Sequence, residues 1–440
     1  MDARFTPELQ RRTIVKVSWR LLPLVVVAYL VAYIDRTNIA VAALTMNKDL
    51  GFSASLYGIG AGIFFIGYAL FEVPSNMILE KVGARMWIAR IMITWGVISG
   101  LMATVTGPTS FLVLRFLLGV AEAGFFPGII FYLTHWFPTA YRARAIAILY
   151  VAVPVANAVA SVVSGAILEM DGVLGVKGWQ WIFIIEAIPA VVLAFVVLRL
   201  MTERPREAQW LAPAQRDWLE TELDTERKKV EAGGRLSILQ SMTDPRVVAL
   251  AAIYFTGVTA SYGIVFFLPQ IVKALGLSNM MTGLVTAIPY TIGTIGLILW
   301  GHSSDRRNER RWHLIVSTTL AAIGIISAGW LTGSFWAVAA MSIATVGIYG
   351  SRPSFWPMPS HFLTGAAAAS GMAFINSVGN VGGYVGPFIV GWIKDSTKSF
   401  EMALYFLGAC ALLSAIIAFL ATRATNDPHT TIEPSGAKAR

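Results

Sequence analysis

Long stretches of this sequence contain no Asp, Glu, Lys or Arg, and they restrict the possible fold more than any other feature. Residues 91–114, 145–168, 247–272 and 402–422 carry no charge, and each run is long enough to cross about 30 Å of hydrocarbon as a helix. Charged residues make up only 13% of the chain, too few to cover a soluble core of this size. The chain is therefore expected to be a polytopic membrane protein rather than a soluble enzyme or a disordered protein.

Interrupted apolar runs between these segments bring the expected number of spans to twelve. A polar stretch separates six spans from the other six, which predicts an all-α membrane protein with two six-helix bundles. The expected parts are an amino-terminal bundle at residues 1–201, a cytoplasmic linker at 202–244, a carboxy-terminal bundle at 245–424 and a cytoplasmic tail at 425–440.

The linker contains a predicted amphipathic helix at residues 214–226. Trp210, Trp218 and Leu223 offer apolar side chains that would lay this helix on the cytoplasmic face of the membrane. A regulatory or partner-binding role for the helix is the alternative.

Basic residues are distributed unevenly between the two sides of the predicted membrane. The side opposite the termini has only Lys48, Lys177, Lys273, Lys394 and Lys398 among the 34 Lys and Arg residues. By the positive-inside rule both termini are cytoplasmic, and the protein is expected in the plasma membrane, or in the inner membrane of a bacterium. This topology accounts for the net charge of +9 without any nucleic-acid partner.

The two halves of the sequence repeat one another. A shift of 225 residues aligns Gly51 with Gly276 and Gly58 with Gly283. The same shift aligns Glu80 with Asp305 and Arg85 with Arg310. A duplicated six-helix unit is typical of transporters that bind substrate near the midplane between the halves and alternate access by rocking.

The loop NMILEKVGAR, which begins at Asn76, and its repeat GHSSDRRNER, which begins at Gly301, resemble the loop signature of the major facilitator superfamily. The resemblance covers nearly the whole chain and implies a conformational latch between helices. The residues expected to form the latch are Glu80, Arg85, Asp305, Arg306 and Arg310. An ordinary solvated turn is the alternative.

Four further motifs resemble the anion:cation symporter family, whose members include sugar-acid, tartrate, phthalate and allantoate permeases. They are YIDRTNIA from Tyr33, RFLLGVAEAGFFPG from Arg115, FWPMP from Phe355 and NSVGNVGGYVGP from Asn376. The resemblance implies that Asp35 and Glu122 carry protons, that Arg36 binds substrate and that Arg115 controls Glu122. It also implies that Tyr33, Tyr68, Trp356 and Asn376 line the site.

Seven charged residues fall within the predicted spans: Asp35, Arg36, Glu72, Arg115, Glu122, Glu186 and Arg352. Each needs a partner, a wet cavity or a function, because a charge at membrane depth costs about 2.5–3.5 kcal/mol or more. Carboxylates suit proton carriage, and Arg side chains, Arg352 included, suit a substrate anion. A purely structural ion pair remains the alternative for Asp35, Arg36, Arg115 and Glu122. Snorkelling remains the alternative for Arg352, and helix packing or gating for Glu72 and Glu186.

The sequence therefore predicts a secondary transporter that imports a small carboxylate with protons by alternating access. A proton antiporter for cationic or amphipathic compounds and a non-transporting nutrient sensor on the same fold are the alternatives. The sequence has no motif for an enzyme, a metal site or a cofactor other than the coupling proton. The expected partners are the carboxylate and the lipid bilayer, and the carrier is expected to be monomeric.

Overall fold

The computed structural model describes residues 6–232, 242–361, 363 and 365–421, and within them the chain is helical without any strand. The amino-terminal half contains α1 (Pro7–Thr37), α2 (Ile39–Asp49), α3 (Ala54–Val82), α4 (Ala84–Leu101), α5 (Pro108–Glu122), α6 (Phe125–Thr134), α7 (Thr139–Leu168) and α8 (Gly178–Leu200). The carboxy-terminal half contains α11 (Pro245–Lys273), α12 (Asn279–Arg307), α13 (Arg311–Trp330), α14 (Trp336–Phe355), α15 (Gly365–Thr397) and α16 (Glu401–Ala421).

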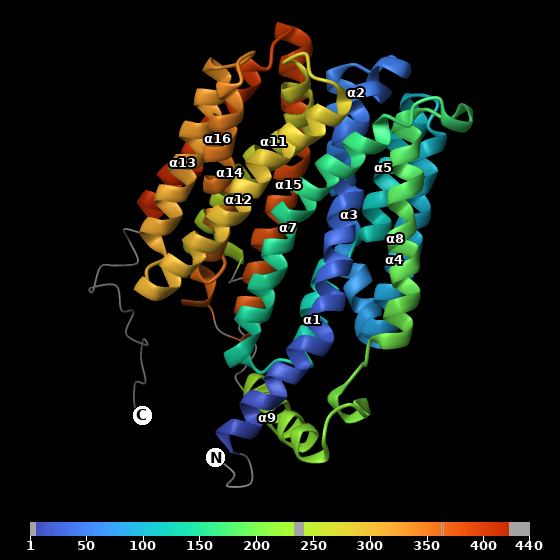
Figure 1. Ribbon diagram of the computed structural model, residues 1–440. Coiled ribbons are helices and arrows are strands. Elements are labelled where there is room, and N and C mark those ends of the chain that lie inside the picture. The colour runs from blue at the N-terminus through green and yellow to red at the C-terminus, as the bar shows by residue number, and fades with distance from the viewer. Residues whose placement is uncertain (1–5, 233–241, 362, 364, 422–440) are drawn as a thin grey trace.

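The helices form two bundles that stand side by side (Figure 1). Within the described residues, ten helical segments are long and apolar enough to cross a membrane, and two of these join consecutive helices, α1 with α2 and α5 with α6. The helices α14 and α15 complete twelve spans, since α14 packs on α12 and α13 while α15 packs on α3 and α11. The predicted all-α, twelve-span fold is confirmed.

The two bundles meet along two equivalent helix pairs, α3 with α15 and α7 with α12. Repeat-related glycines make both contacts close. A Cβ atom on Gly58 would lie 2.3 Å from the carbonyl oxygen of Pro387, and one on Gly283 would lie 2.3 Å from that of Ser161. Neither position can hold a side chain without moving the neighbouring backbone, so the duplication preserved the interface as well as the helices.

Carboxylates fasten the same two helix pairs at the end of the bundle opposite the amino terminus. Asp395 of α15 accepts hydrogen bonds from the backbone N–H groups of Ala54 (3.0 Å) and Ser55 (2.7 Å) at the start of α3. Glu169, just after α7, accepts one from the N–H of Met280 (3.0 Å) at the start of α12. Each carboxylate therefore satisfies free N–H groups at the beginning of a helix from the other half.

The linker helix α9 (Pro213–Ala232) lies near the amino terminus of α1 (Figure 1). Its apolar side chains pack on the protein, which corrects the expectation that they lie on the membrane. Trp218 is buried, and Trp210 stacks on Trp136 with ring centroids 5.4 Å apart. Glu226 accepts a hydrogen bond from the N–H of Thr139 (2.8 Å), which attaches α9 to the start of α7.

Candidate substrate site

The fourth span is broken at its charged motif, whereas the first span is only locally distorted. The first span passes from α1 to α2 at Asn38, two residues after Arg36, and Asn38 keeps helical φ and ψ of −54° and −32°. The fourth changes from α5 to α6 directly after Glu122, where Gly124 adopts a left-handed conformation with φ of 84°. Interrupted helices at membrane depth are tolerated where they are buried in protein or line a cavity, and they commonly form ion and substrate sites.

Gly124 is required at its break for two reasons. Its positive φ is strained for any residue with a side chain, and a Cβ atom there would lie 2.3 Å from the hydroxyl of Ser75. That hydroxyl donates to the carbonyl oxygen of Ala123 (2.7 Å) and accepts from the indole N–H of Trp87 (3.0 Å). The break is thereby held by side chains of α3 and α4.

A central cavity lies between the two bundles and is lined from both. Its lining includes Tyr33, Arg36, Tyr68, Arg352, Trp356 and Asn376, six of the seven residues that the sequence suggested for substrate binding. The seventh, Arg115, does not line it. The remaining wall consists of Tyr29, Phe65, Phe126, Tyr150, Tyr254, Val258, Tyr262 and Asn380.

Arg36 is the centre of the amino-terminal wall of this cavity. It forms a buried ion pair with Glu122, and it donates to the hydroxyl of Tyr262 from the other half (3.5 Å). Its guanidinium carbon lies 4.8 Å from the ring centroid of Tyr33 and 5.4 Å from that of Tyr68. Paired with a carboxylate and flanked by aromatic rings, the cation keeps access to the cavity.

Arg115 has a different environment from the one expected. Its side chain is completely buried and donates to the backbone carbonyl oxygens of Gly60 (3.0 Å) and Ala61 (3.1 Å) in α3. The ion-pair partner of Glu122 is Arg36 rather than Arg115. The position of Arg115 fits a cation that holds α5 against α3.

Asp35 lies inside the amino-terminal bundle rather than at the cavity. It is 1% exposed and accepts hydrogen bonds from the indole of Trp95 (3.0 Å) and the hydroxyl of Ser99 (2.8 Å). Glu186 lies in the same bundle and accepts one from Ser164 (2.6 Å). Within the described part of the chain, neither carboxyl forms an ion pair, so both are solvated by neutral donors alone.

Glu72 connects the two bundles. Its two carboxylate oxygens accept hydrogen bonds from the side-chain amides of Asn376 (3.1 Å) and Asn380 (3.4 Å), which lie one turn apart on α15. Both amides also line the central cavity. The arrangement places a bundle-to-bundle contact directly at the edge of the candidate site.

Arg352 reaches the cavity from α14 in the other half. Its guanidinium carbon lies 5.7 Å from the ring centroid of Tyr349, and no carboxylate of the described residues lies within ion-pair distance of it. Snorkelling away from the protein is excluded, because the side chain lines the cavity wall. Arg36 is thus a paired cation and Arg352 an available one.

The residues suggested for the latch lie where α3 meets α4 and where α12 meets α13. Asp305 at the end of α12 pairs with Arg310, just before α13, at 2.6 Å, whereas Glu80 and Arg306 are exposed. The backbone N–H groups of Ala84 and Arg85 donate to Glu203 rather than to Glu80. The latch between helices stays a prediction.

Glu309 fixes the place where α12 meets α13. It accepts hydrogen bonds from the N–H groups of Trp312 (2.6 Å) and His313 (3.1 Å) at the start of α13. Burial raises the pKa of the Glu309 carboxyl, but these bonds outweigh burial and hold its pKa below the usual value.

Several tyrosines of the site were missed from the sequence. Tyr254 and Tyr262 of α11, with Tyr29 of α1 and Tyr150 of α7, line the cavity. Tyr254 and Tyr262 are eight residues apart and so share a helix face, which was the available signal. This spacing did not indicate a site, because α11 has no charge between its ends and so resembles a helix that is merely packed in the protein core.

A pair of repeated six-helix bundles around a central cavity with buried ion-pairing groups defines a secondary transporter. The chain belongs to the Major Facilitator Superfamily, whose family model matches residues 25–387. This confirms the superfamily expected from the motifs, and it agrees with the absence of any enzyme motif.

Two curated relatives and one solved structure illustrate the similarity. A protein of Agrobacterium vitis named "Putative tartrate transporter" is 49% identical and covers 96% of this chain and 94% of its own. A "Quinolone resistance transporter" of Acinetobacter baumannii is 41% identical, with 94% and 95% covered. The crystal structure of a bacterial homolog of the human lysosomal transporter Spinster matches with a TM-score of 0.72 at 19% identity, covering 92% and 96%, and shows the shared fold.

Proposed function

We propose that this carrier imports small carboxylates together with protons. The observation that supports this proposal best is the buried ion pair between Arg36, which lines the cavity, and Glu122, which ends α5 at the break of the fourth span. A substrate carboxylate and Glu122 compete for the same cation. Protonation of Glu122 would release Arg36 for the substrate, so that anion and proton bind together.

Charge balance explains why such a pair couples the two fluxes. The empty pair of Arg36 and Glu122 has no net charge, and the pair with a bound carboxylate and a protonated Glu122 has none either. Substrate alone would leave one negative charge, and a proton alone one positive charge. Because an unbalanced charge at membrane depth costs several kcal/mol, only the empty and the doubly loaded carrier reorient readily.

Arg352 favours a substrate with a second carboxylate. Arg36 and Arg352 line the same cavity from opposite bundles, so a dicarboxylate could bind both and hold the halves together. The relative named for tartrate, a dicarboxylate, supports this choice of substrate class. Asp35 is proposed as a further protonation site, since it is buried beside Arg36 in the sequence and has only neutral donors.

An exporter of amphipathic compounds is the second candidate. The ring of tyrosines around the cavity and the relative named for quinolone resistance support it. The two candidates differ in the direction of substrate movement relative to the proton gradient.

Uptake into proteoliposomes with an acidic exterior tests the proposal. Wild type is expected to accumulate labelled tartrate, and tartrate diamide is not expected to compete. Glu122→Gln should still bind tartrate, with an affinity that no longer depends on pH, and should not accumulate it. Accumulation only with an acidic interior, or competition by the diamide, would favour the exporter.

A further inference from the structure

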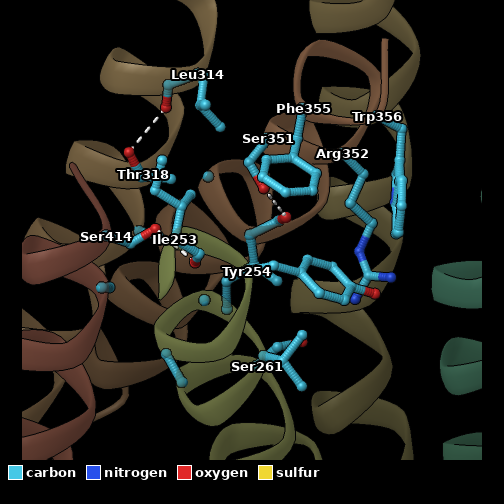
Figure 2. A pocket seen from close by; sticks show the side chains of 17 residues that line it. Ile253, Tyr254, Ser261, Leu314, Thr318, Ser351, Arg352, Phe355, Trp356 and Ser414 are labelled. Carbon is cyan, nitrogen blue, oxygen red and sulfur yellow. Dashed lines mark hydrogen bonds between the residues drawn. The ribbon is translucent and has the colours of Figure 1, made fainter. Parts of the chain in front are cut away.

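A second cavity lies inside the carboxy-terminal bundle, among α11, α13, α14 and α16 (Figure 2). Its volume is about 50 Å³, which is more than one water molecule needs but less than the roughly 150 Å³ of a cavity that binds benzene. No step of the proposed transport cycle uses it. Its lining includes Ala260, Ser261, Leu314, Gly347, Phe355 and Ala411.

Small residues of this lining occupy the positions at which the other half has its charges. Under the 225-residue shift the pairs are Ala260 with Asp35, Ser261 with Arg36, Gly347 with Glu122 and Ala411 with Glu186. The amino-terminal bundle fills its interior with these ionisable side chains, whereas the carboxy-terminal bundle leaves space. The second cavity thus occupies the place of the amino-terminal polar core, and none of these four charges has a charged counterpart there.

Three hydroxyl groups in the cavity wall donate to backbone carbonyl oxygens. Thr318 donates to the carbonyl oxygen of Leu314 (2.8 Å), Ser351 to that of Ile348 (2.8 Å), and Ser414 to that of Ile253 (3.1 Å) (Figure 2). These residues therefore present mainly carbon to the space. A cavity with such walls favours an apolar occupant over water.

The two cavities share part of their walls. Tyr254, Val258, Arg352 and Trp356 line both, and Figure 2 shows Arg352 and Trp356 side by side with Tyr254 at the edge of the second cavity. A carboxylate bound to Arg352 would therefore place the rest of its molecule beside this apolar space.

We propose that the second cavity is a subsite for the apolar part of a carboxylate whose charged group is bound by Arg352. The occupant is an alkyl chain of a few carbons, because the cavity is too small for an aromatic ring. The inference rests on the proposed function, since it requires that the central cavity bind carboxylates. It adds a substrate class, apolar monocarboxylates, to the tartrate-like acids.

Calorimetry on the purified full-length carrier tests the subsite with acetate, butyrate, benzoate and tartrate. In wild type, affinity should rise from acetate to butyrate by about fourfold for each methylene that is buried, and benzoate, whose ring exceeds the cavity, should gain less than butyrate. Ala411→Leu fills the cavity and should weaken butyrate binding by about tenfold or more, with tartrate changed by less than about twofold. Ala411→Val serves as the milder variant and should give a smaller loss.

Ala409→Leu is the matched control, because Ala409 lies on the exposed face of the same helix. It should bind all four acids as wild type does. Equal affinity for acetate and butyrate in wild type, or unchanged butyrate binding in Ala411→Leu and Ala411→Val, would overturn the subsite. A parallel loss of tartrate and butyrate would overturn it too. If wild type bound none of the acids, the proposed function itself would fail.

Discussion

The two bundles share their outer packing and differ in their interiors. Repeat-related glycines, Gly58 and Gly283, make the interface contacts of both halves, and a carboxylate caps a helix of the opposite half in both. Inside, the fourth span is broken at Gly124 in the amino-terminal half, while its counterpart α14 is continuous in the carboxy-terminal half. Duplication therefore kept the contacts that hold the halves together and let the interiors diverge.

The difference suggests a division of work. In the account developed above, the amino-terminal bundle binds protons through Glu122 and Asp35, and the carboxy-terminal bundle contributes Arg352 and an apolar cavity that contact the substrate. Substrate preference could then change through the carboxy-terminal bundle, and proton coupling could change independently through the amino-terminal bundle.

The largest expected effect is the loss of substrate affinity in Arg352→Ala. Arg352 is the cation of the cavity without a carboxylate partner among the described residues, so its removal should weaken tartrate binding by about 2–5 kcal/mol. Arg352→Lys should recover only part of the lost affinity, since a lysine ammonium cannot form the two parallel hydrogen bonds that a guanidinium makes with a carboxylate. Calorimetry would measure both, with the exposed Arg199→Ala as control. Wild-type affinity in Arg352→Ala would remove the carboxy-terminal half from anion binding.

Arg115→Met should affect stability rather than binding. It removes the two hydrogen bonds from the guanidinium to the carbonyl oxygens of Gly60 and Ala61, which are worth about 1.5–3 kcal/mol each because the donor is charged. Thermal unfolding in detergent should shift downward while the folded protein keeps its tartrate affinity. A variant of normal stability with weakened binding would return Arg115 to the substrate site.

The two carboxylates that cap a helix of the opposite half should hold the bundles together to a similar extent. Asp395→Ala and Glu169→Ala each remove one cap and should favour separation of the bundles at that end by about 0.5–2 kcal/mol, or roughly 2- to 30-fold. Cys410 is the only cysteine, so labelling of Val258→Cys in a Cys410→Ser background by an impermeant maleimide would report the opening. If only one variant labels faster, the two halves do not close symmetrically.

Glu186→Gln should have the smallest effect. Burial without a cation favours the neutral acid in this conformation, and Gln has nearly the same shape and still accepts from Ser164. The change in unfolding free energy should stay below about 1 kcal/mol, and infrared spectra should lose one protonated-carboxyl band. A loss of stability as large as that of Arg115→Met would mean that Glu186 is charged.

The fold was predictable because its signals are local. Charge-free runs mark the spans, basic loops mark one side, and the 225-residue repeat divides the chain. The pairing of Arg36 with Glu122 was not predictable, since it depends on the path of the chain after Thr37 and after Glu122, and so on where the two side chains lie. The second cavity also escaped prediction, because missing side-chain volume becomes visible only when the packed bundles are compared.

The most direct test of proton coupling is the proton movement that substrate itself causes. Tartrate added to lightly buffered proteoliposomes without a pH gradient should make the exterior more alkaline as protons enter with it. Asp35→Asn should reduce this alkalinisation while still exchanging labelled for unlabelled tartrate. Tartrate entry without any pH change, or acidification of the exterior, would contradict proton symport.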